Sequence, residues 1–554
     1  MTTLHSIDRR LRVLFVTFVG LLAVGLLRAA ELGTVKAASL RRAAVSQQVI
    51  VANVPAPRGT IMDRHGVELA ISESADDVVA DPYLIQRPTA VAQRLAPLLQ
   101  APVAKVVTEL SKPHTGFVYL AHLFPADRAA AIMRLRINGL SLVPEVARVY
   151  PRGMMAAQVI GTVGWANRGT SGLEYLYNRA LRGVDGIRKT VDDAIGQPIS
   201  IDDLRPTKAG ENIRLTIDSE LQTEVERTLA AVAAKFRPKG ATAIVMNPSS
   251  GQILALANWP RLNPNDTSTA SPQAFEDQAV GLTYEPGSTF KAFTVGGALQ
   301  DHLIAPSTKF NVPPALDFGG YQIHDAEVHG YETLTVAQIL KVSSNIGAVE
   351  IGQKLGGRRF DYWVHRFGFG SPTGVDLPGE QQGIVRHWWQ YSGSSMANLP
   401  FGQGESVTPM QMITAYAAIA NGGILRTPQI VESVGGKRLK PPKGRRVLSP
   451  TVAHELRVML RGVFADGGTA SGAAIPGYDM AGKTGTANIA VGGHYSNSEY
   501  IASFVGMVPV NHPRLLALVV VDQPHGGIFG GAVAAPAFQQ IIGWAVPYFG
   551  VTPR

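Results

Sequence analysis

The hydrophobic pattern of the chain opens with an uninterrupted apolar run. Residues 13–27 (VLFVTFVGLLAVGLL) contain no charged side chain and a single hydroxyl. Arg12 and Arg28 flank the run, and basic side chains at such positions snorkel toward the membrane interfaces, which brings the segment near the ~20 residues that a bilayer requires. The pattern therefore predicts a transmembrane anchor over residues 13–30. Arginines concentrate in residues 1–12, so the positive-inside rule places this segment in the cytoplasm and the rest of the chain outside.

A cleaved signal peptide is the main alternative for this N-terminal segment, because the small residues of AAELGTVKAAS follow it. Arg28 stands directly after the apolar run and no well-placed A-x-A site adjoins it, which favours an uncleaved anchor. A buried core helix is disfavoured by the basic flanks and by the position near the terminus.

The pattern is mixed between the anchor and residue 206. Residues 31–50 predict a helical juxtamembrane stalk. In residues 51–206, short alternating segments and turns are interspersed with helical patches such as AVAQRLAPLL, which indicates a module rich in irregular β structure and without catalytic motifs.

From residue 207 to residue 554 the pattern becomes regular. The segment ENIRLTID alternates like a strand, SELQTEVERTLAAVAAKF has the helical period, and ATAIVMNPSSGQILALANWP predicts a β-hairpin. In VTPMQMITAYAAIANGG, Thr408 is the expected N-cap, Pro409 the first helical residue and Asn421 the start of the stop signal. The segments YIASFVGMVP and RLLALVVVDQP return to strands, so the pattern predicts a sheet with helices packed on it.

Composition removes several classes of function. Hydrophobic content of 45% and charged content of 17% indicate a globular protein, and the absence of cysteine excludes disulfides, thiolate metal sites and a cysteine nucleophile. The net charge is +9, yet lysines and arginines are scattered, which disfavours nucleic-acid binding. The densest basic patch, residues 435–446, predicts a solvated loop suited to anionic envelope polymers.

The segment YEPGSTFKAF brings a hydroxyl and an ammonium together. Pro286 and Gly287 make a corner, after which Ser288 begins a helix whose free N–H groups favour developing negative charge. Lys291 follows three residues later, on the same face. A lysine of pKa about 10.4 needs roughly 4.6 kcal/mol of destabilisation to be half neutral at pH 7, so a base at Lys291 requires burial and a second cation nearby.

Two further polar segments are candidates for the same site. In DMAGKTGTA, Lys483 supplies a cation, Thr484 and Thr486 supply hydroxyls for a substrate carboxylate, and Gly485 leaves room for a substrate strand. Ser343-Ser344-Asn345 interrupts a helical pattern at a position where polar residues make poor core. Each element alone also fits an N-capping serine with a solvated lysine. The stronger evidence for a shared site is that the motifs S-x-x-K, S-x-N and K-[ST]-G occur together and in this order.

This ordered triplet resembles the penicillin-binding transpeptidase and serine β-lactamase superfamily. The segments RGTIMDRHGVELA, YPRGMMAAQVIGTVG and GTSGLEYLYNRALRGVDG are similar to the pedestal motifs of class B penicillin-binding proteins, and FGQGESVTPMQM and GGAVAAPAF extend the similarity. Without a glycosyltransferase module, the chain is most similar to the cell-division (septal) type. The implied fold is α/β (α+β): an anchor, an elongated β-rich pedestal of the dimerisation type over residues 51–206, and a transpeptidase domain over residues 207–554 with an antiparallel sheet flanked by helices.

The resemblance implies an enzyme that cross-links peptidoglycan stem peptides through a serine acyl-enzyme, uses no cofactor or metal, and is acylated by β-lactams. Ser288 would attack the penultimate D-Ala carbonyl with Lys291 as base, while Ser343 relays protons. Asn345 would orient Lys291, and Lys483 would lower the pKa of that lysine. The implied catalytic residues are Ser288, Lys291, Ser343, Asn345 and Lys483; the substrate-binding residues are Thr484, Gly485 and Thr486, with the N–H groups of Ser288 and Thr486 as oxyanion hole.

Other charged clusters receive structural interpretations. Arg58, Asp63, Arg64, Arg152 and Glu174 stand beside Gly-rich turns and predict salt bridges. His324, Asp325, Glu327 and His329 match no firm metal-ligand spacing and predict a polar loop. The implied partners are a SEDS-type polytopic glycosyltransferase and other division proteins, at the inner membrane with the catalytic part periplasmic or extracellular.

Alternatives stay open at this point. A β-lactamase or β-lactam sensor shares the motif triplet but leaves the pedestal module unexplained. The intact set of motif side chains argues against a non-catalytic division scaffold. Elongation and sporulation transpeptidases carry the same motifs, and only the short segment of 71 residues after Lys483 favours the septal role. The third residue of the stem peptide, the acceptor and the affinity for each β-lactam stay undetermined.

Overall fold

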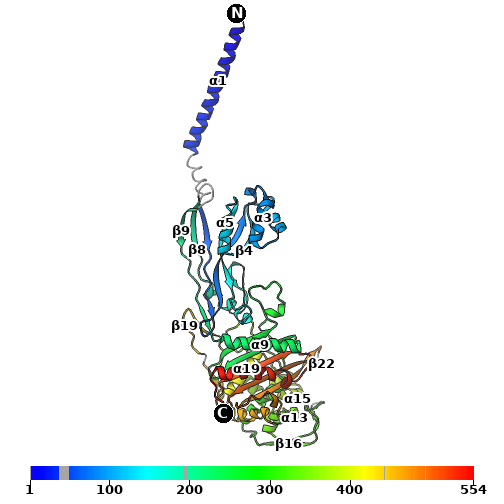
Figure 1. Cartoon of the computed structure of the whole chain (residues 1–554). Helices are drawn as coiled ribbons and strands as arrows, with labels where there is room; N and C mark the ends of the chain where they lie inside the picture. The colour runs from blue at the N-terminus through cyan, green and yellow to red at the C-terminus, as the bar shows by residue number, and fades with distance from the viewer. Residues whose placement is uncertain are drawn as a thin grey trace. The chain divides into compact units, whose positions relative to one another are not determined.

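The computed structural model describes residues 2–36, 49–192, 198–318, 320–441, 443–492 and 494–553. Figure 1 follows the chain by colour from its N-terminus to its C-terminus. The chain forms two compact units, and each is assembled from separate stretches of sequence. The first unit comprises residues 1–57, 74–146 and 183–209; the second comprises residues 58–73, 147–182 and 210–554.

The apolar N-terminal run forms one long helix, α1 (Thr2–Ala30), which continues into a π-turn, η1 (Glu31–Val35). The segment Leu11–Val35 has a hydropathy of 2.3 and buries none of its side chains against the rest of the protein. By length and composition, this helix fits a single-pass membrane anchor.

The predicted helical stalk over residues 31–50 differs from the structure at its C-terminal end. Residues 37–48 lie outside the described residues. Val49 and Ile50 begin strand β1 (Val49–Val54), so the helical prediction is wrong for these two residues. Two successive β-branched residues pair with β8 (Gly186–Asp192), where Val49 lies opposite Val191, and this pairing decides their conformation.

The first unit contains two β assemblies. Strands β1, β8 and β9 (Pro198–Arg205) form an antiparallel sheet. The C-terminal half of β3 (Glu68–Ala80) pairs with β4 (Val118–Pro125), and α3 (Pro88–Leu99), α4 (Val103–Leu110) and α5 (Ala126–Met133) complete a small core around Val78, Leu95 and Ile132. The helical patch AVAQRLAPLL lies within α3.

The second unit is built on a five-stranded antiparallel sheet in the order β12-β11-β23-β22-β21. The strands are β11 (Gly240–Asn247), β12 (Gln252–Trp259), β21 (Ala481–Val491), β22 (His494–Val508) and β23 (Leu515–Asp522). The strands carry consecutive buried hydrophobic residues. Because adjacent residues of a strand face opposite sides of the sheet, both faces of this sheet are apolar. Strand β21 lies at one end of the strand order, which leaves its outer edge without a partner strand among the described residues.

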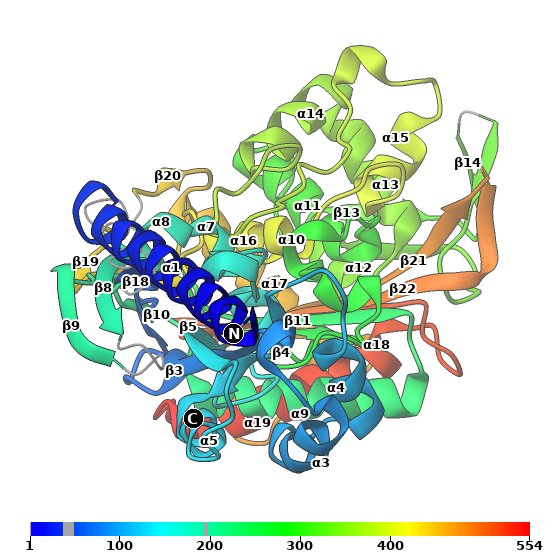
Figure 2. The ribbon, with the colours of Figure 1, turned by 90° about the horizontal axis from the view of Figure 1, so that it is seen from above.

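Helices cover both faces of the sheet (Figure 2). Val245 and Val519 contribute to a core shared with α9 (Ser219–Phe236) and α19 (Ala535–Tyr548). Ile244 and Leu518 face the other side, into a larger core shared with α11 (Lys291–Gln300), α16 (Pro409–Ala420) and α17 (Pro450–Arg461). The predicted antiparallel sheet flanked by helices is confirmed.

Local signals in the sequence account for several of these elements. Asp218 caps α9 by accepting a hydrogen bond from the N–H of Leu221, and α9 covers the predicted helical segment. The hydroxyl of Thr408 accepts from the N–H of Gln411 in a capping box, with Pro409 as the first residue of α16. The predicted hairpin is formed by β11 and β12, where Ala241 lies opposite Trp259.

Smaller elements complete the second unit. Its other helices of four residues or more include α6 (Ala157–Ile160), α7 (Gly172–Leu176), α8 (Asn178–Leu181), α10 (Gln278–Gly281), α12 (Val336–Val342), α13 (Asn345–Leu355), α14 (Gly357–Arg366), α15 (Ser395–Asn398) and α18 (Gly530–Val533). Its short strands include β2 (Ile61–Met62), β10 (Ile213–Leu215), β13 (Lys309–Val312), β14 (Leu316–Phe318), β15 (Tyr321–Ile323), β16 (Glu332–Thr335) and β18 (Val431–Val434).

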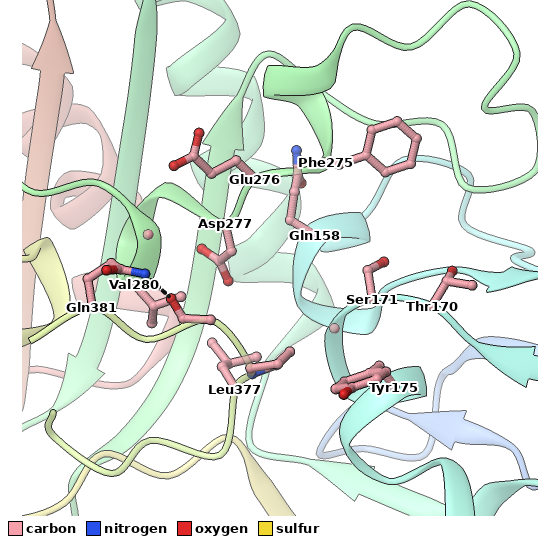
Figure 3. A pocket seen from close by; sticks show the side chains of 14 residues that line it. Gln158, Thr170, Ser171, Tyr175, Phe275, Glu276, Asp277, Val280, Leu377 and Gln381 are labelled. Carbon is pink, nitrogen blue, oxygen red and sulfur yellow. Dashed lines mark hydrogen bonds between the residues drawn. The ribbon is translucent and has the colours of Figure 1, made fainter.

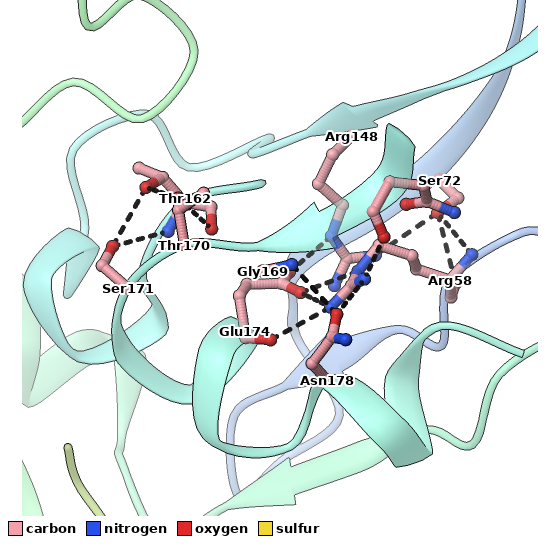
Figure 4. A network of polar contacts seen from close by, with 10 residues as sticks. Arg58, Ser72, Arg148, Thr162, Gly169, Thr170, Ser171, Glu174 and Asn178 are labelled. Carbon is pink, nitrogen blue, oxygen red and sulfur yellow. Dashed lines mark hydrogen bonds and ion pairs between the residues drawn. The ribbon is translucent and has the colours of Figure 1, made fainter. Parts of the chain in front are cut away.

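A buried ion network holds the segments 58–73 and 147–182 together (Figure 4). Glu174 lies 2.6 Å from Nη2 of Arg58 and 2.6 Å from Nε of Arg148, and the side chains of Arg58 and Glu174 are fully buried. Arg58 also donates to Oδ1 of Asn178 at 2.9 Å. The predicted salt bridge is confirmed for Arg58 and Glu174.

The same prediction is wrong for the other three charged residues. Asp63 accepts hydrogen bonds from the N–H groups of His65 and Val67 and from the hydroxyl of Ser219. Within the residues that the structure describes, no ion pair involves Asp63, Arg64 or Arg152. Asp63 therefore stabilises a turn by accepting hydrogen bonds from neutral N–H and hydroxyl groups, which satisfy its carboxylate in place of a cation.

We expect Glu174→Gln to destabilise the protein by roughly 3–5 kcal/mol, because the two arginines then lose the buried carboxylate that they share. Thermal or denaturant unfolding of the full chain measures the loss. Glu327→Gln, at an exposed carboxylate, is the matched control and is expected to change little. Equal stability of the two variants would contradict a structural role for the network.

Candidate active site

Ser288 lies in a 3-10 turn, η5 (Gly287–Phe290), that runs directly into α11. Gly287 has φ +54, and a Cβ at this position would lie 2.7 Å from the carbonyl oxygen of Thr486, so only glycine permits the close approach of the turn to β21. Tyr416 also holds this turn, because its hydroxyl donates a hydrogen bond to the carbonyl oxygen of Thr289 at 2.7 Å. Ser288 itself is half-buried, beside the edge strand of the sheet.

The ammonium of Lys291 is fully buried and faces the S-x-N segment. Its Nζ donates to the carbonyl oxygen of Ser343 at 2.5 Å, to the hydroxyl of Ser343 at 3.2 Å and to Oδ1 of Asn345 at 2.7 Å. Within the described residues, the hydroxyl of Ser288 forms no hydrogen bond with Lys291; catalytic hydrogen bonds commonly tighten only when substrate is bound.

Ser343 occupies the break between α12 and α13 with φ 65, a left-handed conformation that costs a non-glycine residue of order 1 kcal/mol or more. This backbone conformation turns its hydroxyl toward two lysines: Nζ of Lys483 donates to it at 2.8 Å. A hydroxyl that accepts from two ammonium groups has its own hydrogen left to donate. The motifs S-x-x-K, S-x-N and K-T-G thus meet at one oxygen atom.

Burial decides the charge state of the two lysines. Burial lowers the pKa of Lys291 to about 7, while the negative charge of Asp325 opposes the change. Burial, and then the neighbouring cation of Lys291, lower the pKa of Lys483 well below its usual value. The sequence predicts that burial and a second cation together lower the pKa of Lys291. In the structure burial is the leading cause, and the repulsion between the two lysines lowers the pKa of Lys483 instead.

Asp325 is a site residue that the sequence argument missed. Its Oδ1 accepts from the N–H groups of Asn345, at 2.5 Å, and Ile346, at 3.0 Å, and so begins α13. Its Oδ2 lies 3.1 Å from Nε2 of His329. Asp325 therefore positions Asn345 and adjusts the pKa of Lys291. The only signal in the sequence was a carboxylate in a polar loop, and nothing there indicated that the loop returns to the site.

The K-T-G strand is held rigidly at the edge of the sheet. A Cβ on Gly485 would lie 2.2 Å from the hydroxyl of Ser503, so the absence of a side chain is required for packing within the protein as well as for access. The hydroxyl of Thr484 bonds to that of Thr469 at 2.8 Å, and the hydroxyl of Thr486 accepts from the N–H of Gly530 at 3.1 Å. The outer edge of β21 beside Ser288 has the chemistry to bind an extended peptide as an added strand.

A cavity of about 440 Å³ lies elsewhere in the second unit, between residues 158–175, 275–281 and 377–381 (Figure 3). Asp277 is buried in its wall, and this burial raises the pKa of Asp277 to about 6. None of the eight predicted site residues lines the cavity. The predicted catalytic groups are gathered instead around Ser343.

Comparisons with known proteins identify the family of this chain. The family model of the penicillin-binding protein transpeptidase domain matches residues 241–543, and that of the penicillin-binding protein dimerisation domain matches residues 53–215. Stage V sporulation protein D of Bacillus subtilis (strain 168) is 35% identical over 511 residues, which cover 90% of this chain and 79% of the relative. Peptidoglycan D,D-transpeptidase FtsI of Escherichia coli (strain K12) is 32% identical over 512 residues, which cover 91% of this chain and 85% of the relative.

Solved structures give the same result for the fold. The crystal structure of penicillin-binding protein 3 from Mycobacterium tuberculosis complexed with ampicillin superposes with a TM-score of 0.72 at 28% identity, covering 91% of this chain and 97% of that one. The ligand in that structure, ampicillin, is a β-lactam. With a transpeptidase family model matching more than half of its length and relatives along nearly all of it, the chain belongs to the class B penicillin-binding proteins, the family of peptidoglycan D,D-transpeptidases.

Proposed function

We propose that this protein cross-links peptidoglycan stem peptides by serine acyl transfer, with Ser288 as the nucleophile. One observation carries the assignment: the two buried Nζ atoms of Lys291 and Lys483 converge on the hydroxyl of Ser343 at 3.2 and 2.8 Å. Ser288 precedes Lys291 in the same continuous helical segment. This arrangement supplies a nucleophile, a base of pKa about 7 and a proton relay within one site.

Acylation begins at Ser288. Neutral Lys291 accepts the hydroxyl proton while Oγ of Ser288 forms a bond to the carbonyl carbon of the penultimate D-Ala. The C–N bond to the terminal D-Ala then breaks, and the leaving nitrogen takes a proton through Ser343, which regains one from Lys291. Backbone N–H groups of Ser288 and Thr486 stabilise the oxyanion, a contribution of about 10²–10³ in rate for each donor.

Deacylation transfers the acyl group to a second stem peptide. Its amine forms a bond to the ester carbon and passes its proton through Ser343 to Lys291. The C–O bond to Ser288 then breaks, and Lys291 returns the proton to Oγ of Ser288. Asn345 keeps Lys291 directed at this path, and Thr484 and Thr486 bind the substrate carboxylate in the field of Lys483. Gly485 leaves the edge of β21 accessible to the peptide backbone. A β-lactam acylates Ser288 by the same first step.

We assign residues 13–30 as the anchor, residues 51–206 as the pedestal and residues 207–554 as the transpeptidase domain. Residues 1–12 lie in the cytoplasm, residues 31–50 connect the anchor to the pedestal, and the catalytic part is periplasmic. The exposed apolar surface of α1 and the arginines near its N-terminal end, within residues 1–12, support this orientation in the inner membrane. The pedestal couples the enzyme to a SEDS-type glycosyltransferase, which supplies the glycan strands.

We propose the division septum as the place of action. The relative named FtsI is 32% identical and aligned over 85% of its length, and the sporulation protein is 35% identical and aligned over 79% of its length, so the phenotype of the catalytic variant decides between the roles. A strain of the source organism whose only copy carries Ser288→Ala, with wild-type expression withdrawn, is expected to form filaments without completed septa. Rounded cells would instead assign the enzyme to elongation, and normal growth with defective spores would assign it to sporulation.

A further inference from the structure

Two histidines and an aspartate outside the transpeptidase site gather their ligand atoms in one place. Asp361 and His365 lie one turn apart on α14, and His387 comes from the loop that precedes the 3-10 turn η6 (Trp388–Gln390). All three ligand atoms lie within 4.8 Å of one another. Nδ1 of His365 is 2.8 Å and Nδ1 of His387 is 3.4 Å from the same carboxylate oxygen, Oδ1 of Asp361.

This carboxylate oxygen is buried and has no hydrogen-bond partner among the described residues. Nδ1 of His365 also lies 3.0 Å from the backbone carbonyl of Asp361, and that carbonyl takes the hydrogen when this nitrogen is protonated. Burying a carboxylate oxygen without a hydrogen bond is unfavourable, so Oδ1 favours a cation beside the two imidazole nitrogens.

Aromatic stacking holds both imidazoles in a common orientation. The rings of His365 and His387 are stacked with centroids 4.5 Å apart and planes inclined by 13°. Trp389 stacks on the other face of His387 at 4.3 Å. The side chains of His365 and His387 remain 28% and 45% exposed, so an ion can enter from solvent. The two nitrogens are thus held toward one oxygen before any ligand binds.

We propose that Asp361, His365 and His387 bind a divalent transition-metal ion of the zinc class. Two imidazole nitrogens and one carboxylate oxygen are the donor set that such ions prefer, whereas Mg²⁺ and Ca²⁺ prefer oxygen ligands alone. Ligand atoms around tetrahedral zinc are about 3.3 Å apart, given bonds of about 2.0 Å, which is close to the observed separations from Oδ1 of Asp361. Because an imidazole binds a metal in its ring plane, binding also requires the two stacked rings to rotate apart until both planes contain the ion. Water completes the coordination.

The ion links α14 to the loop that carries His387. After this loop, the chain passes through α15 and η7 (Leu399–Phe401) to Gly402, whose carbonyl accepts from the N–H of Gly287 in the nucleophile turn at 2.9 Å. The carbonyl of Pro400 accepts from the hydroxyl of Thr294 on α11 at 2.7 Å. The metal site therefore stabilises the segment that supports the turn carrying Ser288, without contacting substrate.

Calorimetric titration of the metal-stripped full chain in detergent with ZnCl₂, in the presence of excess Mg²⁺, tests the proposal. We expect one site per chain, and at least tenfold weaker binding for both Asp361→Asn and His387→Gln. His512→Gln, at an exposed histidine, is the matched control and should bind like the wild type. Zinc should also raise the Tm of the wild type and of the control, and not that of the two ligand variants.

Co²⁺ provides a spectroscopic readout of the same site. Bound Co²⁺ is expected to show visible absorption bands as intense as those of four-coordinate Co²⁺ in the wild type. These bands should be lost in His387→Gln. Fluorescent penicillin labelling of each variant verifies that the protein is folded. Absence of zinc binding, or a site of unchanged affinity in labelled Asp361→Asn and His387→Gln, would overturn the proposal and leave the three side chains as an ion-paired cluster.

Discussion

Replacing Ser288 with alanine is expected to abolish covalent labelling by a fluorescent penicillin and to lower stem-peptide cross-linking by about 10⁴-fold or more. The Oγ atom that forms the acyl-enzyme is then absent, and loss of a serine nucleophile typically removes nearly all of the covalent rate enhancement. The measurement is gel fluorescence of the detergent-solubilised full chain after incubation with the labelled drug, together with release of D-Ala from a stem-peptide substrate.

Ser268→Ala is the matched control, because Ser268 is exposed in a loop and its hydroxyl donates a hydrogen bond to Asp266, away from the site. It should label like the wild type. A label that forms on wild type and disappears rapidly would identify a β-lactam hydrolase. A wild type that never labels, or equal labelling of Ser288→Ala, would contradict the nucleophile assignment and favour a scaffold.

The acylation rate is expected to rise with pH and to reach half of its plateau near pH 7. Lys291 must be neutral to accept the proton of Ser288, and burial lowers the pKa of Lys291 to about 7. Below this value the ammonium form predominates, so the rate at pH 6 should be about tenfold below the plateau. Above it the neutral form predominates and the rate levels off. Stopped-flow or quench measurements of penicillin acylation between pH 5 and pH 9 give the profile.

Asp325→Asn provides a directional test of the same assignment. The carboxylate of Asp325 favours the ammonium form, so its removal lowers the pKa of Lys291 further and should move the acid limb of the profile to lower pH. The amide oxygen retains an acceptor for the N–H groups of Asn345 and Ile346. Asp317→Asn, at an exposed position in β14, should leave the profile unchanged. An acid limb that stays in place, or moves to higher pH, would exclude Lys291 as the titrating base.

Features that depend on local interactions were predicted correctly from the sequence. The spacing of Ser288 and Lys291, the N-cap at Thr408 and the hairpin of β11 and β12 each depend on residues close together in the chain. The two-residue error at Val49 and Ile50 has the opposite origin, because their conformation depends on pairing with β8, more than a hundred residues later. The family resemblance supplied the catalytic roles, since spacing alone left an N-capping serine as an equal interpretation.

Long-range packing decided the rest of the site. The sequence did not indicate that Asp325 returns to the start of α13, that the packing of Ser503 requires a glycine at position 485, or that burial lowers the pKa of Lys291 against the charge of Asp325. Nor did it bring His387 to Asp361.

By itself, the sequence determined the anchor, the order of the catalytic motifs, the helices and strands with strong local signals, and the family. Only the tertiary structure decided that two lysines share the hydroxyl of Ser343, and which charge state burial favours for each. The physical reason is that propensity and capping act over a few residues, whereas desolvation and hydrogen-bond geometry depend on every segment that packs around a group.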